Sequence, residues 1–104
     1  MGGNILAHDL NINGSDVIVR LKGSIFSKEA TKMREDLIDC LEKGYKNFVF
    51  DFSEVIDFDS TGLGVIVTIR KRVLTNGKVV VRNLNPNTKE LFERTRLNKI
   101  LVSL

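Results

Sequence analysis

The chain has 104 residues, of which 42% are apolar and 28% are charged, with 16 Lys and Arg against 13 Asp and Glu. These values are typical of one globular domain, and we expect residues 1–104 to form a single domain. One Cys and one His cannot make an intrachain disulfide or a four-ligand zinc site, so we expect no metal-binding residues. No apolar run approaches the roughly 18 residues of a membrane span, and the amino-terminal segment lacks a secretion signal, so we expect a cytoplasmic protein that does not bind membranes.

Charge is segregated along the chain. Residues 51–59 contain four carboxylates, whereas residues 70–82 contain five cationic side chains. The basic stretch has no interleaved aromatic residues and matches no RNA-binding signature. We therefore interpret it as a solvated helix face and expect no direct contact with nucleic acid.

A β-hairpin is predicted at the amino-terminal end. The turn sequence at 13–16, NGSD, separates the segment 5–12 from the alternating apolar residues of 17–21. A helix is expected next, because Ser27 can cap it, Gly44 follows its last turn, and apolar residues recur at helical spacing. Those residues are Ala30, Met33, Leu37 and Leu41. Cys40 is expected on the buried side as a small hydrophobic residue.

The remainder of the chain alternates strands and helices. The apolar segment 48–52 predicts a central strand, and residues 61–75 predict a helix that buries Leu63, Ile66, Ile69 or Val67, and Val73. A strand at 79–81 follows. Asn85 before Pro86 is typical of a helix start, and residues 100–102 predict a last short strand.

The element order is therefore β-β-α-β-α-β-α-β. Right-handed crossovers in the βαβ units predict parallel strands beside the antiparallel hairpin. We expect an α/β domain with a mixed sheet and helices packed mainly on one face.

No catalytic constellation is evident. A Ser-His-Asp triad would require His8, which we place at the exposed start of the hairpin, and neither a nucleophile elbow nor a nucleotide-binding glycine loop occurs. Asp57 and Asp59 are paired carboxylates in a predicted connecting loop, where such groups are commonly solvated. We expect no enzyme activity and no cofactor.

The segment 57–64, DFDSTGLG, joins a strand to the second long helix. Asp59 and Ser60 are both good N-caps, and the first-turn amides of a helix favour a negative group, so a phosphate on Ser60 would be accommodated there. Gly62 and Gly64 each lower helix propensity by roughly 1 kcal/mol relative to Ala. Either core packing or a closely approaching partner requires this first turn to lack side chains. The simpler interpretation is that Ser60 only caps the helix and the glycines only allow tight packing.

The same segment carries a family resemblance. Residues 59–65, DSTGLGV, resemble the Asp-Ser-Ser/Thr-Gly-Leu-Gly motif of STAS domains, specifically the bacterial anti-sigma factor antagonists. Residues 17–23 resemble the second strand of that family and its glycine, residues 48–52 its central strand, and residues 91–97 its third helix. Relatives usually continue into a fourth carboxy-terminal helix, which we do not expect here.

The resemblance implies a mechanism called partner switching. Family members bind an anti-sigma factor that is also an ATP-dependent serine kinase, and thereby free a sigma factor. The kinase phosphorylates the antagonist on the hydroxyl residue after the motif Asp, which is Ser60 here, and a serine phosphatase restores the antagonist. A phosphate adds about −1.5 to −2 charges, so binding should weaken by repulsion and desolvation.

The loop between the third strand and the second helix, together with the start of the first helix, is the expected partner surface. Both follow strand carboxyl ends, where open α/β sheets place binding loops. Its expected residues are Ser24, Ser27, Asp57, Asp59, Ser60, Thr61, Gly62 and Leu63. Ile25 and Phe26 are interpreted as buried. The alternative function is a STAS interaction module of another pathway, either a stressosome-like scaffold or a small-ligand sensor.

Overall fold

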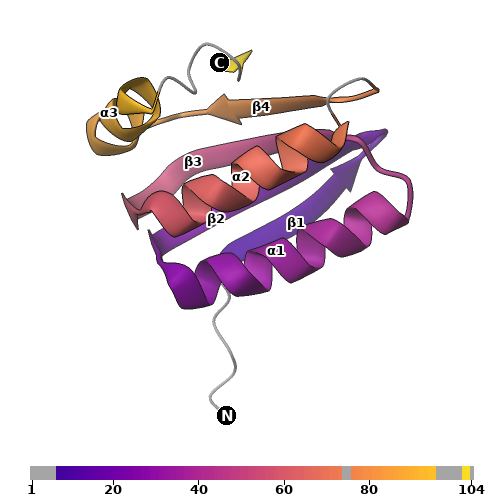
Figure 1. The fold of residues 1–104 in the computed structure, drawn as a ribbon, viewed down its shortest axis with the longest axis horizontal. Helices are drawn as coiled ribbons and strands as arrows, with labels where there is room; N and C mark the ends of the chain where they lie inside the picture. Colours follow the sequence, from indigo (N-terminus) through magenta and orange to yellow (C-terminus); the bar gives the residue numbers. More distant parts are fainter. Residues whose placement is uncertain (1–6, 74–75, 96–101, 104) are drawn as a thin grey trace.

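Eight elements follow the predicted order in the computed structural model, which describes residues 7–73, 76–95 and 102–103 (Figure 1). They are β1 (His8–Asn13), β2 (Asp16–Ile25), α1 (Ser27–Glu42), β3 (Asn47–Phe58), α2 (Ser60–Val73), β4 (Lys78–Arg82), α3 (Pro86–Arg94) and β5 (Val102–Ser103). The predicted hairpin, helices and strands are therefore confirmed as types and in order. Residues 5–6, 74–75 and 100–101, which fall in predicted strands and a helix, lie outside the described residues.

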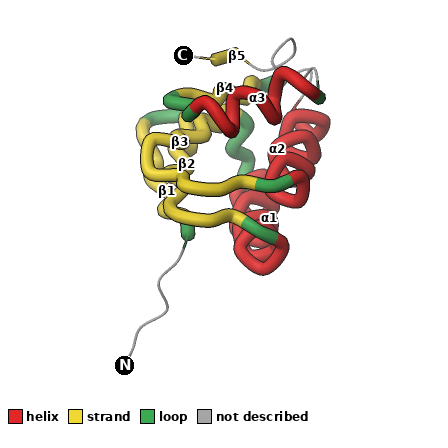
Figure 2. Tube along the Cα trace, turned by 90° about the vertical axis from the view of Figure 1, so that its left-hand side faces the viewer, coloured by secondary structure: helices red, strands yellow, loops and turns green. Residues whose placement is uncertain are grey.

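The strands form one sheet in the order β1-β2-β3-β4-β5. β1 is antiparallel to β2, and each later strand is parallel to the one before it. Right-handed crossovers that all advance in one direction place their helices on the same face of the sheet. Figure 2 shows this arrangement, with α1 and α2 stacked against one side of the sheet. The predicted mixed sheet with helices mainly on one face is confirmed.

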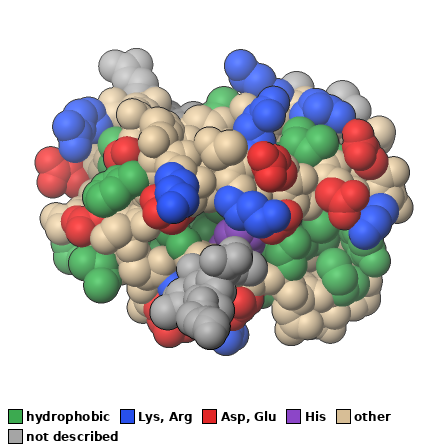
Figure 3. Space-filling view, turned by 90° about the horizontal axis from the view of Figure 1, so that it is seen from below, with side chains coloured by type: hydrophobic (Ala, Val, Ile, Leu, Met, Phe, Trp, Pro, Cys, Tyr) green, Lys and Arg blue, Asp and Glu red, His purple; other side chains and the backbone are tan. Residues whose placement is uncertain are grey.

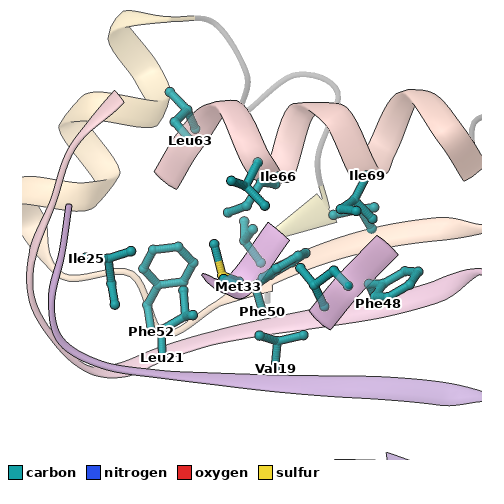
Figure 4. Packing of buried hydrophobic residues seen from close by; sticks show 14 of the residues in the cluster. Val19, Leu21, Ile25, Met33, Phe48, Phe50, Phe52, Leu63, Ile66 and Ile69 are labelled. Atoms are coloured by element: carbon teal, nitrogen blue, oxygen red, sulfur yellow. The ribbon is translucent and has the colours of Figure 1, made fainter. Parts of the chain in front are cut away.

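The hydrophobic core lies between the sheet and these helices (Figure 4). The alternating residues Phe48, Phe50 and Phe52 of β3 project toward the helices and are buried. α1 and α2 contribute Met33 and Ile66 from the opposite side. The predicted apolar stripe of α2 is confirmed, with Ile69 rather than Val67 in the buried set, and Cys40 is buried on α1 as expected.

β3 is longer than predicted, because it continues from the expected 48–52 to Phe58. β2 extends to Ile25 alongside it, and the parallel pairing accommodates two register shifts, one near Arg20 and one near Gly23. At the second shift Gly23 pairs with Val55 while Ser24 pairs with Asp57, so Ile56 is the extra, bulged residue. Asp57 therefore lies in a strand, and the prediction that it lies in a connecting loop was wrong.

His8 is buried rather than exposed, since the residue retains only 2% exposure. Its Nε2 lies 2.7 Å from Oδ2 of Asp36 on α1, which connects the first strand to the first helix. Figure 3, which views the molecule from below, shows only a small part of the histidine (purple), with charged side chains of both signs nearby. The prediction failed because strand position alone does not reveal that α1 covers the beginning of β1.

Candidate functional site

Four elements meet at one end of the sheet, at the left of Figure 1: the carboxyl ends of β2 and β3 and the first turns of α1 and α2. Two hydrogen bonds connect the strand ends. The Ser24 hydroxyl donates to Oδ2 of Asp57 over 3.3 Å, and the Asp59 amide donates to the carbonyl of Ile25 over 3.3 Å. The parallel pairing of β2 and β3 thus brings together segments about thirty residues apart.

Asp59 is the residue that caps α2. Its Oδ1 accepts hydrogen bonds from the amides of Thr61 at 3.0 Å and Gly62 at 3.4 Å, and its carbonyl accepts from the amide of Leu63 at 3.2 Å. Ser60 is the first helical residue and does not cap, contrary to the expectation that it shares this role. The first-turn amides that a phosphate on Ser60 was expected to use are therefore already satisfied by a carboxylate.

The two hydroxyl residues at the start of α2 differ in their surroundings. Ser60 is exposed, and within the described part of the chain its hydroxyl makes no hydrogen bond. The Thr61 hydroxyl is also exposed but donates to the Asp59 carboxylate. Transfer of a phosphoryl group requires a hydroxyl oxygen that can reach the donor, and Ser60 meets this condition without breaking a contact.

Gly62 and Gly64 differ in the space that surrounds them. A Cβ on Gly62 would lie 2.6 Å from Cε1 of Phe58, whereas a Cβ on Gly64 would have no atom within 4 Å. Core packing, one of the two explanations that the sequence left open, therefore applies to Gly62 and not to Gly64. Gly62 allows α2 to pack against Phe58, and Gly64 leaves open space on the exposed side of the helix.

An aromatic cluster supports the site from beneath. The ring of Phe58, the last residue of β3, lies 4.9 Å from that of Phe52 and 6.3 Å from that of Phe92 on α3. Phe52 and Phe92 are themselves in edge-to-face contact at 5.8 Å. Edge-to-face and offset pairs at these separations are favourable, so the cluster holds the end of β3, and hence Asp57 and Asp59, against the core.

The start of α1 differs from the prediction. Phe26, not Ser27, occupies the N-cap position, and its amide donates to the Glu29 carboxylate over 3.0 Å. Ser27 is the exposed first residue of the helix. Residue type favoured Ser27 as the cap, but the extended backbone of β2 continues through Phe26, so the helix begins at Ser27.

Two exposed hydrophobic residues lie next to these groups. Phe26 is 46% exposed and Ile56 is 67% exposed. The prediction that Phe26 is buried was wrong, while Ile25 is buried as expected. The sequence did not predict Ile56 as a surface residue of this site. Its exposure results from the bulge in β3, and no local sequence pattern predicts that bulge.

The structure brings all eight predicted partner-surface residues to this end of the sheet. Six of them reach the surface at least in part: Ser24, Ser27, Asp57, Asp59, Ser60 and Thr61. Gly62 and Leu63 are buried on the core side of α2, so they support the surface without being part of it. Sequence alone could not divide the segment in this way.

The described residues contain neither a metal-binding cluster nor a membrane-spanning helix. These residues contain no group of three His, Cys, Asp or Glu side chains arranged to hold a metal ion. Their helices include none that is long and apolar enough to span a bilayer.

The sequence profile of the STAS domain family matches residues 7–104. The chain belongs to the STAS family. A curated relative from Bordetella bronchiseptica is named "Putative anti-sigma factor antagonist BtrV" and is 28% identical over 78 residues, which are 74% of this chain and 67% of the relative. The family resemblance of the sequence is thus confirmed.

Solved structures show the same STAS fold. The tm1081 protein of Thermotoga maritima superposes with a TM-score of 0.86 at 26% identity, covering 92% of this chain and 84% of that one. The anti-sigma factor antagonist SpoIIAA in its unphosphorylated form gives a TM-score of 0.79 at 17% identity, covering 94% and 87%. SpoIIAA of Bacillus in its phosphorylated form also gives 0.79, at 18% identity over 94% and 91%. At the identity of SpoIIAA, this likeness concerns the fold alone.

Proposed function

We propose that this STAS domain is an anti-sigma factor antagonist that works by partner switching. In its unphosphorylated form it binds an anti-sigma factor that is also an ATP-binding serine kinase, and a sigma factor is released. Phosphorylation of Ser60 ends this binding, and a serine phosphatase reverses it. The names of BtrV and of the tm1081 protein, a "putative anti-sigma factor antagonist", support the class of function.

The observation that carries the proposal is the free, exposed hydroxyl of Ser60 at the first position of α2. It follows two carboxylates in sequence, Asp57 and Asp59, and exposed apolar side chains suited to a protein contact lie at the same end of the sheet. Phe26 and Ile56 supply that apolar area. A hydroxyl in such a place can be modified in the free protein and becomes part of a desolvated contact in the complex.

The charges around Ser60 explain why phosphate would act as an off-switch. The amides of Thr61 and Gly62 already bind the Asp59 carboxylate, so a phosphate on Ser60 gains few new hydrogen bonds within the domain. Its charge of about −1.5 to −2 would instead be added to that of Asp57 and Asp59. Desolvating this group of like charges against a partner is costly, and the complex should dissociate.

The test begins with capture of partners from the native cytoplasm, with and without ATP. The proposal requires that a protein with a serine-kinase ATPase domain is recovered, and that ATP reduces its recovery. The purified partner is then incubated with this protein and ATP, and the phosphate is located by mass spectrometry. Phosphate on Ser60 supports the proposal, whereas phosphate on Thr61 alone would overturn the assignment.

Matched variants separate modification from binding. Ser60→Ala should prevent phosphorylation and leave binding intact, because Asp59 and not Ser60 caps the helix. Ser60→Asp should weaken binding, and Thr61→Ala is the control that should remain phosphorylated. If a captured partner lacks a kinase domain and no phosphate is transferred, the protein is instead a STAS interaction module of another pathway.

A further inference from the structure

A groove of about 350 Å³ lies between α1 and α2 and begins beside Ser27 and Thr61. One wall is the α1 stripe Ala30, Thr31 and Arg34, and the other is the α2 stripe Gly64, Val65 and Thr68. In each helix the stripe runs for two turns from the first residues, at the spacing of one helix face. We call this feature the interhelix groove.

The floor of the interhelix groove is apolar. Ala30 and Val65 are buried at its base, with 3% and 5% exposure. The hydroxyls of Thr31 and Thr68 donate to carbonyls of their own helices, those of Ser27 at 2.8 Å and Gly64 at 2.9 Å. The donor hydrogens of these two hydroxyls are therefore used within their own helices.

Gly64 keeps the middle of the groove open. Apart from its chain neighbours and the nearby backbone of its own helix, no described atom lies within 4 Å of a Cβ placed on Gly64. Glycine weakens this exposed helix turn by about 1 kcal/mol relative to alanine. The fold does not require that cost, because nothing packs against Gly64, so the opening is suited to an aliphatic side chain from another molecule.

Arg34 supplies a positive charge at the end of the interhelix groove that is farther from Ser27 and Thr61. It is exposed and makes no ion pair or hydrogen bond with any part of the chain that the structure describes. Lys32 of α1 and Lys43 at its C-cap are different, since each lies near a carboxylate, at 3.4 Å and 3.0 Å. A guanidinium group without a partner beside an apolar floor is complementary to a carboxylate, which it can bind with two parallel hydrogen bonds.

The groove has the length of a short peptide segment. Arg34 follows Ser27 by seven residues, which places it about 10 Å along the helix from the end where Ser60 lies. An extended chain covers this distance in about three residues. A peptide segment that contacts the end of the domain where Ser60 lies can thus continue directly into the interhelix groove.

We propose that the interhelix groove receives an extended segment of the partner kinase, with an aliphatic side chain over Gly64 and an Asp or Glu against Arg34. This inference rests on the proposed function and identifies the chemistry of the partner that this chain recognises. Arg34 is then a specificity-determining residue for the partner, separate from the phosphorylated hydroxyl.

The experiment compares three variants with the purified kinase recovered in the capture experiment, using calorimetry to measure affinity. Arg34→Glu removes the cation, Gly64→Leu fills the groove with a good helix former, and Lys71→Glu is a matched charge control at the far end of α2. We expect affinity losses of roughly tenfold or more for the first two variants and no loss for the control. Because salt screens exposed charges, the loss for Arg34→Glu should shrink in high salt while that for Gly64→Leu persists.

The outcomes distinguish this inference from the proposed function. If the wild-type protein binds the kinase and both groove variants bind equally well, the groove inference is overturned and partner switching stands. If the wild-type protein binds no kinase, the proposed function itself fails. A charge exchange gives the decisive support: one Asp or Glu→Arg variant of the kinase should restore binding to Arg34→Glu.

Discussion

The ring of Phe58 lies directly against Gly62, so that a Cβ on this glycine would be 2.6 Å from the ring. Phe58 ends β3 and Gly62 lies in the first turn of α2, and their contact brings the strand end and the helix start close together. The ring cannot move aside freely, because Phe52 and Phe92 hold it. The position of Ser60, two residues before Gly62, therefore depends on the aromatic core.

Alanine substitutions at the two glycines of α2 should change stability in opposite directions. Gly62→Ala should destabilise the domain by about 1–3 kcal/mol, since it overpacks the site against Phe58. Gly64→Ala should raise the free energy of unfolding by up to about 1 kcal/mol, because it improves helix propensity in open space. Urea denaturation measures both values, and destabilisation of equal size in the two variants would contradict the packing described here.

The carboxylate of Asp51 should make the free energy of unfolding depend on pH in the acid range. Burial opposes its charged form, but hydrogen bonds from Asn83 Nδ2 at 3.0 Å and the Ser53 amide at 2.9 Å, together with Arg82, lower its pKa below the ordinary value of 3.8. A carboxylate with a lowered pKa stabilises the fold above its unfolded pKa, and this contribution is lost as pH falls through the folded value. Asp51→Asn should thus cost about 1–3 kcal/mol at pH 7.

Urea denaturation of wild type and Asp51→Asn from pH 7 down to pH 2 tests this expectation. The difference in unfolding free energy should stay constant above about pH 5 and narrow below the ordinary pKa. A difference that does not change with pH would show that Asp51 acts only by its shape.

Asn83 occupies a backbone conformation that few side chains adopt, with φ of 61°. Asn83→Ala loses the hydrogen bond to Asp51 and retains a Cβ in the left-handed region, whereas Asn83→Gly loses only the hydrogen bond. The Asn83→Ala variant should therefore be less stable than the Asn83→Gly variant by about 1 kcal/mol. Thermal unfolding of the pair provides the measurement, and an alanine variant as stable as the glycine variant would refute it.

Ile56 should matter for binding and not for folding. Its side chain is 67% exposed on the bulge of β3, so Ile56→Ser should change the unfolding free energy by less than about 0.5 kcal/mol. Affinity for the kinase partner should nevertheless fall, because an apolar contact beside Asp57 is lost. Ile12→Ser is the matched control. Ile12 is also an exposed isoleucine, at 44%, but it lies beside the hairpin turn, at the end of the sheet opposite the candidate site. Equal effects of the two variants on affinity would count against the proposed surface.

The sequence by itself determined the elements and the family. Turn residues at 13–16, helical spacing in α1 and α2, and the Asn85 cap before Pro86 are local signals that arise within a few residues. Asn85 indeed accepts from the Thr88 amide at 2.8 Å. The motif at 59–65 likewise pointed to the family, because its residues are adjacent in the chain.

The tertiary structure decided which of those residues face solvent. The bulge that exposes Ile56 depends on pairing between β2 and β3, and the burial of His8 depends on α1, so neither follows from local periodicity. The difference between Gly62 and Gly64 likewise depends on Phe58, which contacts only one of them. The interhelix groove exists only when two helices from different crossovers lie side by side on one face of the sheet. Contacts between segments distant in sequence are set by the packing of the whole domain, and a single sequence records them only indirectly.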